Sequence, residues 1–205
     1  MSIIISENKV QINKKKLSGV LEWPVPTKVK QVQAFLGFVN FYHRFIENFA
    51  KISKLFFNLT KKNSIWTWDK EQQNAFEVLK NAFTMAPVLR IPNDKDLFKL
   101  STNANDFATE AVLLQKDIQT NLWHPVAFFS KSLDVHERNY KIYDKKLLVV
   151  IQGLEEYKHH LKGHLYKVEI WLDHQNLTFF RTAHFDFVLY HKPGKTMQVE
   201  DPLSR

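Results

Sequence analysis

Three histidines in the second half of the sequence raise the possibility of a metal site. His159, His160 and His164 lie within six residues of one another. Imidazole is a common zinc ligand, but structural zinc sites usually add cysteine, and this chain has no cysteine. The three residues also fall at the end of an expected helix. We therefore assign no zinc site to them.

The lysine and arginine side chains suggest a different chemistry, the binding of phosphate. The net charge is +8, and residues 1–92 carry 14 Lys/Arg against 6 Asp/Glu, whereas residues 93–205 carry 15 of each. A basic segment of this kind favours a polyanion, most commonly a nucleic acid, although a basic surface that only meets solvent is an alternative. The candidates for phosphate contacts are Lys28, Lys30, Arg44, Lys51, Lys54, Lys61 and Lys62.

Composition excludes several classes of protein. With 205 residues, of which 44% are hydrophobic, the chain can form one large or two small globular domains. The lack of cysteine excludes a disulfide scaffold and a thiolate nucleophile, and it permits an intracellular setting in cytoplasm or nucleus without establishing one. No apolar run reaches the roughly 18 to 20 residues that span a bilayer, so we expect no membrane partner.

The elements that must position these side chains change character near Pro92. Before it, the pattern predicts a hairpin, an extended linker at Pro24 and Pro26, and helices with apolar residues three and four apart. Gly37 is expected to mark close packing or a break, and Asp69 to cap the last helix. The aromatic residues of this half fit a core better than a base-stacking surface. The expected ranges are a hairpin over 3–12 and helices over 29–49, 52–59 and 69–83.

After Pro92, short runs of alternating polarity predict strands around one long helix. The order is three strands, a helix, a strand, a short helix and a last strand, which indicates an α/β class. The expected strands are 97–102, 108–115, 124–130, 166–172 and 185–190, and the expected helices are 134–161 and 176–180.

Several long segments carry a specific resemblance. They are FLGFVNFYHRFIENF at 35–49, WTWDKEQQNAFEVLKNAFTMAPVL at 66–89, HPVAFFSKSL at 124–133, ERNYKIYDKKLL at 137–148 and LDHQNL at 172–177. Together with the tail DPLSR they resemble the Pol polyprotein of gypsy-type LTR retrotransposons. The resemblance implies that residues 1–92 form a small helical thumb or connection region of a reverse transcriptase. It implies that residues 93–205 form an RNase H-like domain, with a mixed five-stranded sheet and flanking helices. Other parts of a Pol polyprotein are then possible partners.

RNase H chemistry, which the resemblance implies, cleaves the RNA strand of an RNA-DNA hybrid by two-metal catalysis with Mg²⁺ or Mn²⁺. Four carboxylates of the family hold the metal ions. At the matching positions this chain retains Asp173 and Asp201 as metal ligands, but it has Asn103 and Lys146 in place of the other two. Mg²⁺ requires anionic oxygen ligands, so we expect impaired metal binding and lost catalysis. We also expect Lys146 to fill the vacated metal position and pair with Asp173.

Two further departures from the family concern the domain's shape. The chain runs directly from Ala183 into His184, where the family has an additional basic helix, so one helix is expected to be deleted. Glu110 stands where the family usually has glycine.

The resemblance leaves three hypotheses about function. The first is a remnant of a reverse transcriptase and RNase H with a disabled metal site, which no polymerase palm precedes and which therefore should not polymerise DNA by itself. The second is a non-catalytic nucleic-acid-binding or interaction module that uses the basic N-terminal half. The third is a relic without a present role.

Overall fold

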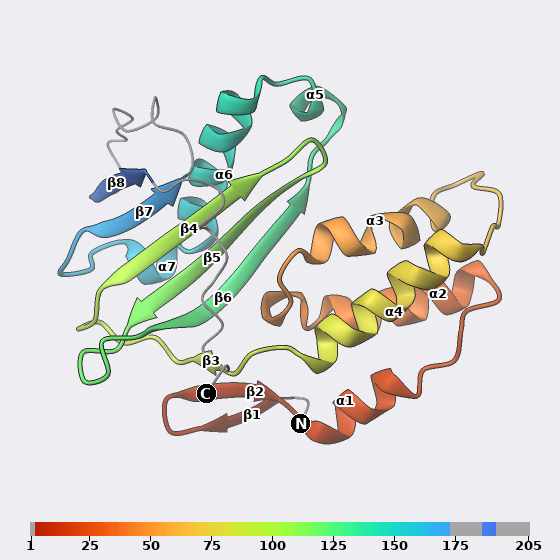
Figure 1. The fold of residues 1–205 in the computed structure, drawn as a ribbon, viewed down its shortest axis with the longest axis horizontal. Coiled ribbons are helices and arrows are strands. Elements are labelled where there is room, and N and C mark those ends of the chain that lie inside the picture. Colours follow the sequence, from red (N-terminus) through yellow and green to blue (C-terminus); the bar gives the residue numbers. More distant parts are fainter. Residues whose placement is uncertain (1–2, 173–185, 192–205) are drawn as a thin grey trace. The chain divides into compact units, whose positions relative to one another are not determined.

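The fold was analysed in a computed structural model, which describes residues 3–172 and 186–191. The chain divides into two compact units, Met1–Val88 and Leu89–Arg205. Figure 1 shows a largely helical first unit and a second unit built on a sheet.

The described part of the first unit contains a hairpin, four α-helices and one 3-10 helix. The hairpin was expected over 3–12, and Asn8, with φ of 56°, turns the chain between its strands. The helix α1 was not expected; Asn13 caps it by accepting a hydrogen bond from the backbone N–H of Lys15 at 2.9 Å. The elements are β1 (Ile3–Ser6), β2 (Lys9–Ile12), α1 (Lys14–Leu21), α2 (Val29–Asn40), η1 (His43–Phe45), α3 (Phe49–Leu59) and α4 (Lys70–Thr84).

Aromatic side chains make the core of this unit. Phe35 of α2 contacts Phe76 of α4 with ring centroids 4.8 Å apart, and Tyr42 contacts Phe83 at 5.1 Å. The expectation that Gly37 marks close packing or a break is wrong, since Gly37 lies inside α2 with open space where a Cβ would stand. The break comes instead after Asn40, before η1. Asp69 caps α4 in a capping box with Gln72, as expected.

The second unit is built on the expected five-stranded mixed sheet. Its strand order is β6-β5-β4-β7-β8, antiparallel from β6 to β4 and parallel from β4 to β8 (Figure 1). The strands of the sheet are β4 (Phe98–Ala104), β5 (Ala108–Lys116), β6 (Trp123–Ser132), β7 (Val168–Leu172) and β8 (Phe187–His191), and the short β3 (Leu89–Arg90) precedes them.

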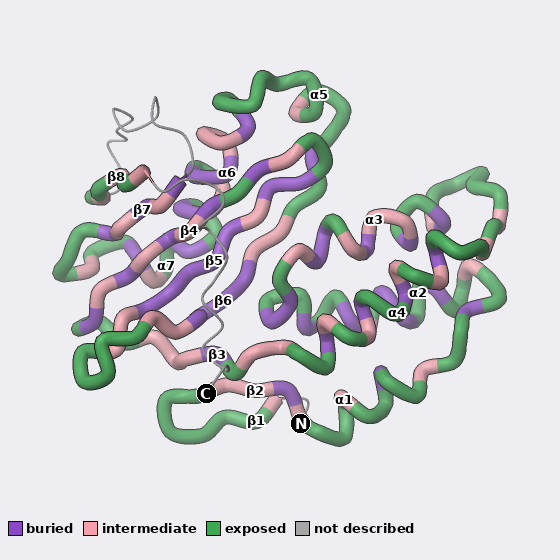
Figure 2. The backbone as a smooth tube through the Cα atoms, in the orientation of Figure 1, coloured by how far each residue is buried: buried purple, intermediate pink, exposed green. Residues whose placement is uncertain are grey.

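One face of this sheet forms the core with helix α6 (Ile142–Glu156). Leu100, Leu113 and Ile170 are fully buried on that face, and α6 contributes Val149 and Val150. The backbone of Gly153 approaches so closely that a Cβ there would stand 3.1 Å from the Leu100 side chain. Figure 2 shows the buried residues running along β4, β5 and α6.

The single helix expected over 134–161 is three helices, α5 (Val135–Arg138), α6 and α7 (Lys158–Leu161). Asp134 begins α5 in a capping box with Glu137, and Lys141 is extended, so α6 begins anew at Ile142. Gly163, with φ of 79°, follows α7 and ends the helical region. The short helix expected over 176–180 and the deletion between Ala183 and His184 lie outside the described residues.

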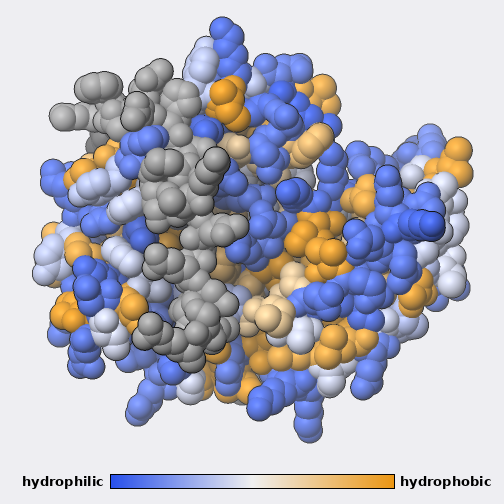
Figure 3. All heavy atoms as spheres, viewed as in Figure 1, coloured by the Kyte–Doolittle hydropathy of each residue, from blue (hydrophilic) through white to orange (hydrophobic). Residues whose placement is uncertain are grey.

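Within residues 3–172 and 186–191, no helix is both long and apolar enough to cross a membrane. Figure 3 shows hydrophilic and hydrophobic residues mixed on the face that it draws. Among the large hydrophobic residues that the structure describes, the most exposed are Ile65 at 83%, Leu165 at 78% and Met85 at 75%.

Candidate functional site

The carboxyl end of β4 holds the first of the expected site residues. Asn103 is an exposed residue of β4, and its neighbours Thr102 and Ala104 are buried. The chain then turns at Asn105, whose Oδ1 accepts hydrogen bonds from the backbone N–H groups of Phe107 and Ala108 at 2.9 and 3.0 Å. This turn leads the chain directly into β5.

Glu110 stands opposite Asn103 across the β4–β5 ladder. Directly opposed residues of an antiparallel pair point to the same face, with Cβ atoms about 4.5 to 5.5 Å apart. The position that the family fills with a small residue therefore places a carboxylate beside the amide of Asn103. The sequence identified Glu110 as a departure, and the register gives it this neighbour.

The first turn of α6 lies against the turn between β4 and β5. Lys145 Nζ donates to Asp106 Oδ1 at 3.0 Å, and the Lys145 side chain is 5% exposed while that of Asp106 is 80% exposed. Lys146 is half-buried and precedes the buried Val149 and Val150 by three and four positions, so it shares their face of the helix. The structure thus brings the beginning of α6 to the end of β4.

Sequence reasoning missed the role of Lys145. The helical spacing could have predicted that Lys145 is buried, because it precedes Val149 and Gly153 by four and eight positions. Both of these residues are buried. Lys145 also engages Asp106, the carboxylate in the turn after β4. This carboxylate is paired with an ammonium group, which makes it a poor ligand for a cation.

The described part of this site does not fit a pair of divalent ions. Asn103 has no charge and Lys146 has a positive one, where the resemblance implies two carboxylates. Among residues 3–172 and 186–191 there is no group of three or more His, Asp or Glu that could hold a metal ion. His159, His160 and His164 therefore do not form such a group. Asp173 and Asp201, and with them the expected pairing of Lys146 with Asp173, lie outside the described residues.

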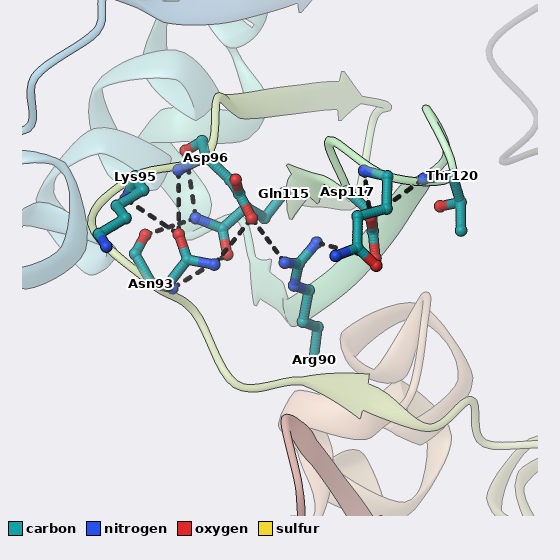
Figure 4. Close-up of polar contacts among 8 residues, drawn as sticks. Arg90, Asn93, Lys95, Asp96, Gln115, Asp117 and Thr120 are labelled. Atoms are coloured by element: carbon teal, nitrogen blue, oxygen red, sulfur yellow. Dashed lines mark hydrogen bonds and ion pairs between the residues drawn. The ribbon is translucent and has the colours of Figure 1, made fainter.

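A buried polar network, which the sequence did not reveal, fixes the approach to β4 (Figure 4). Arg90 Nη2 donates to Asp96 Oδ2 at 2.6 Å, and Arg90 Nη1 lies 3.8 Å from Asp117 Oδ2. The side chain of Gln115 on β5 donates to the Asn93 carbonyl at 2.6 Å and accepts from the Asn93 N–H at 3.1 Å. The network ties residues 90–96 to the end of β5, next to the first residue of β4.

Asp117 in this network has a perturbed acidity. The backbone N–H groups of Thr120 and Gln119 donate to its carboxylate, at 3.2 and 2.8 Å, and lower the pKa of Asp117 below its ordinary value, with a smaller contribution from the charge of Arg90. The charged form therefore stabilises this turn between β5 and β6.

The expected phosphate-binding residues lie in the first unit, most of them on or beside α3. Lys51 and Lys54 are three residues apart on α3, and Lys61 and Lys62 follow its end. Arg44 lies on η1, whereas Lys28 and Lys30 lie at the beginning of α2. All seven are exposed except Lys54, which is half-buried. Glu47 is the only acidic residue between positions 23 and 68.

One family of protein domains matches about half of this chain. Residues 68–170 match the model of the RNase H-like domain found in reverse transcriptase. The matched range begins just before α4 and ends in β7, so it takes in the carboxyl end of β4 and the whole of α6.

Curated relatives match almost the whole chain. The chain is 32% identical over 98% of its length to the retrovirus-related Pol polyprotein from transposon 297 of Drosophila melanogaster, of which it covers 20%. It is 30% identical, over the same share, to the transposon Tf2-3 polyprotein of Schizosaccharomyces pombe, of which it covers 16%. The chain thus spans about a fifth or less of the length of these relatives.

Solved structures share the fold. The foamy viral protease-reverse transcriptase in complex with an RNA/DNA hybrid superposes on 86% of this chain and 24% of its own with a TM-score of 0.71 at 17% identity. The same enzyme in complex with dsDNA covers 95% of this chain and 45% of its own, with a TM-score of 0.72 at 15% identity. Together with the family match, which covers half of the chain, these findings make it a member of the family of RNase H-like domains found in reverse transcriptase.

Proposed function

We propose that this chain binds nucleic acid, with an RNA-DNA hybrid as the principal ligand, and does not cleave it. The observation that carries the proposal is Lys146, a cation at a position where the family's metal chemistry requires a carboxylate. Two unit charges about 4 Å apart interact with about 4 kcal/mol at an effective dielectric constant of about 20, and a divalent ion roughly doubles this value. Repulsion of that size opposes Mg²⁺ or Mn²⁺ at this position.

The surroundings of Lys146 support the same proposal. Asn103 contributes no charge, and Asp106 is neutralised by Lys145. Asp173 and Asp201 are the two carboxylates that this chain retains at the positions where the resemblance implies metal ligands. Two carboxylates are fewer anionic ligands than two metal ions require. Any residual binding of Mg²⁺ or Mn²⁺ would depend on these two residues.

The basic surface of the first unit supports the binding part. Arg44 lies on η1 just before α3, Lys51 and Lys54 lie on α3, and Lys61 and Lys62 follow its end; we call these five residues the α3 basic row. A stretch of sequence with these five cations and one acidic residue, Glu47, suits a polyphosphate backbone, whose contacts are independent of sequence and weaken with salt. Lys28 and Lys30 would extend it from α2.

The domain assignment is part of the proposal. We assign residues 1–92 to the thumb or connection region of a reverse transcriptase and residues 93–205 to the RNase H-like domain. The support is the match to Pol polyproteins over 98% of the chain. The bound hybrid and dsDNA in the complexes of the foamy viral enzyme belong to that enzyme, and they suggest which ligands to test first.

Cleavage is tested with a labelled RNA-DNA hybrid in Mg²⁺ or Mn²⁺. The chain itself is expected to leave the RNA intact. The double substitution Asn103→Asp, Lys146→Glu is expected to restore cleavage, because it returns both carboxylates to the site. Adding Asp173→Asn to that variant should abolish the restored activity, which excludes a contaminating nuclease. Cleavage by the unmodified chain that Asp173→Asn removes would contradict the proposal.

Binding is tested separately, with the same hybrid in metal-free buffer at several salt concentrations. Each lost phosphate contact should lower the slope of log affinity against log salt by about 0.9, the value for B-form DNA. The triple substitution of Lys51, Lys54 and Lys61 by Gln should therefore lower the slope by about 2 to 3. A control with the same charge change replaces the exposed Lys95, Lys141 and Lys162 of the second unit. Equal losses in both variants would refute a specific role of the α3 basic row.

A further inference from the structure

A row of two lysine and three aromatic side chains crosses the sheet of the second unit, and we propose that it binds the unpaired bases of a single-stranded nucleic acid. We call it the lysine-aromatic strip. Lys99 Nζ lies 4.3 Å from the ring centroid of Trp123 and 5.1 Å from that of Trp171. Lys116 Nζ lies 5.9 Å from the Trp123 ring, and Trp171 stacks on Tyr190 at 5.4 Å with an interplanar angle of 26°.

The register of the strands places all five residues on one face. Lys116 is opposite Trp123 in the β5–β6 ladder, and Trp171 is beside Tyr190 in the β7–β8 ladder. Ser101 is beside Trp171, and Lys99 is two residues before Ser101 on β4, so Lys99 points to the same side. The strip therefore runs across the strands from β6 to β8, a distance of about 19 Å at roughly 4.8 Å per strand.

This face is opposite the one that α6 covers. The core residues Leu100 and Ile170 alternate with Lys99, Ser101 and Trp171 along their strands. On β8, Leu189 packs against the core while Val188 and Tyr190 are 39% and 41% exposed. Lys99, Lys116, Trp123 and Trp171 are all half-buried. The strip is thus accessible in part and is not a component of the hydrophobic core.

The rings of the strip are held in place before any ligand arrives. Trp171 Nε1 donates to Glu169 Oε2 at 3.0 Å, which orients the indole, and Tyr190 supports it on one side. The ammonium of Lys99 lies near both indoles, at distances suited to cation-π interaction. A pre-organised set of rings loses little side-chain entropy on binding, which favours affinity.

The chemistry of the strip fits unpaired bases better than a duplex. Indole and phenol rings stack on the faces of bases, and these faces are accessible only where the bases are not paired within a helix. The lysines among the rings match the phosphates that link the bases. The carboxylate of Glu169, which is beside Lys99 in the β4–β7 ladder, is engaged with the indole N–H. This site lies in the second unit and is separate from the α3 basic row of the proposed function.

Three oligonucleotide probes of equal length separate stacking from charge. They are an oligo-dT, the same backbone without bases, and a blunt duplex, each with a fluorescent label whose anisotropy reports binding to the full chain. We expect the chain to bind oligo-dT at least about fivefold more tightly than the abasic strand, since stacking contributes roughly five- to hundredfold per base. Equal affinity for the two single strands would overturn the proposal.

Substitutions then locate the stacking surface. Trp123→Leu and Trp171→Leu should each weaken oligo-dT binding about five- to fiftyfold while leaving the abasic strand nearly unchanged. Trp171→Phe, which keeps a ring, should restore most of the loss. The control is Trp66→Leu in the first unit, a half-buried tryptophan that stacks on Trp68 at 5.8 Å, and it should have no effect on the preference for bases.

The outcome does not depend on every variant folding. Thermal unfolding by circular dichroism identifies a variant that has lost structure, and Lys99→Gln provides a second test that removes no ring. Lys99→Gln should weaken the binding of both single strands, because it removes a charge. An unchanged affinity of folded Trp123→Leu and Trp171→Leu for oligo-dT would refute the strip as the site. Loss of binding in the α3 triple variant alone would leave the proposed function standing and contradict this inference.

Discussion

Lys145 on α6 and Asp106 in the turn after β4 form an ion pair of 3.0 Å in which one partner is buried and the other exposed. The pair joins the first turn of α6 to the end of β4, the two elements that carry Lys146 and Asn103. It also removes Asp106 from the carboxylates that are available to a cation. Lys145, the neighbour of the expected Lys146, is therefore the residue that links the two elements of the candidate site.

The strength of this ion pair is measurable by a double-mutant cycle of Lys145→Met and Asp106→Asn. Because Asp106 is largely in solvent, the coupling energy should be small, about 0.2 to 1 kcal/mol, and it should fall as salt is added. Urea unfolding of the four proteins at low and high salt gives the value. A coupling well above this range that salt does not change would show that the pair is shielded from water.

Two glycines in helices should respond to alanine in opposite ways. Gly37→Ala should stabilise the protein by about 0.5 to 1 kcal/mol, because alanine favours a helix and no atom lies near the new methyl group. Gly153→Ala should destabilise it by roughly 1 kcal/mol, because the methyl group would meet Leu100 at 3.1 Å and Ala111 at 3.4 Å in a filled core. Unfolding midpoints compare the two directly, and stabilisation by both would mean that the α6 interface yields easily.

The stability at acid pH should depend on Asp117. Hydrogen bonds from the Thr120 and Gln119 backbones lower its pKa in the folded state, so its contribution is complete above the unfolded value of about 3.9 and disappears as the pH falls through the folded pKa. Asp117→Asn should be less stable than the parent at pH 7, and the difference should shrink below about pH 4. A difference that stays constant from pH 7 to pH 3 would contradict this assignment.

The N-terminus of α4 should be sensitive to its cap. Asp69→Ala removes a side chain that accepts from the Glu71 N–H, and it should cost about 1 kcal/mol of stability. Asp69→Asn serves as the control, since asparagine caps helices nearly as well as aspartate. Equal losses in the two variants would point to the charge rather than the hydrogen bond.

Local patterns in the sequence determined most elements of this protein. The alternation around residues 97–130 predicted three strands, and Asp69 predicted the beginning of α4. These signals work because helix caps and strand alternation depend on neighbours within a few residues. The same locality explains the failures at Gly37 and over 134–161, where the break positions depend on how each segment packs.

Asn103 and Lys146 were also recognised from the sequence as replacements of carboxylates, because a residue type can be identified without a structure. Tertiary structure alone decided which residues meet. The register placed Glu110 opposite Asn103, and α6 brought Lys145 to Asp106 across 39 positions of the chain. The lysine-aromatic strip likewise joins residues from five strands, from Lys99 to Tyr190. Such contacts are fixed by strand pairing and burial over long sequence separations, which no local pattern records.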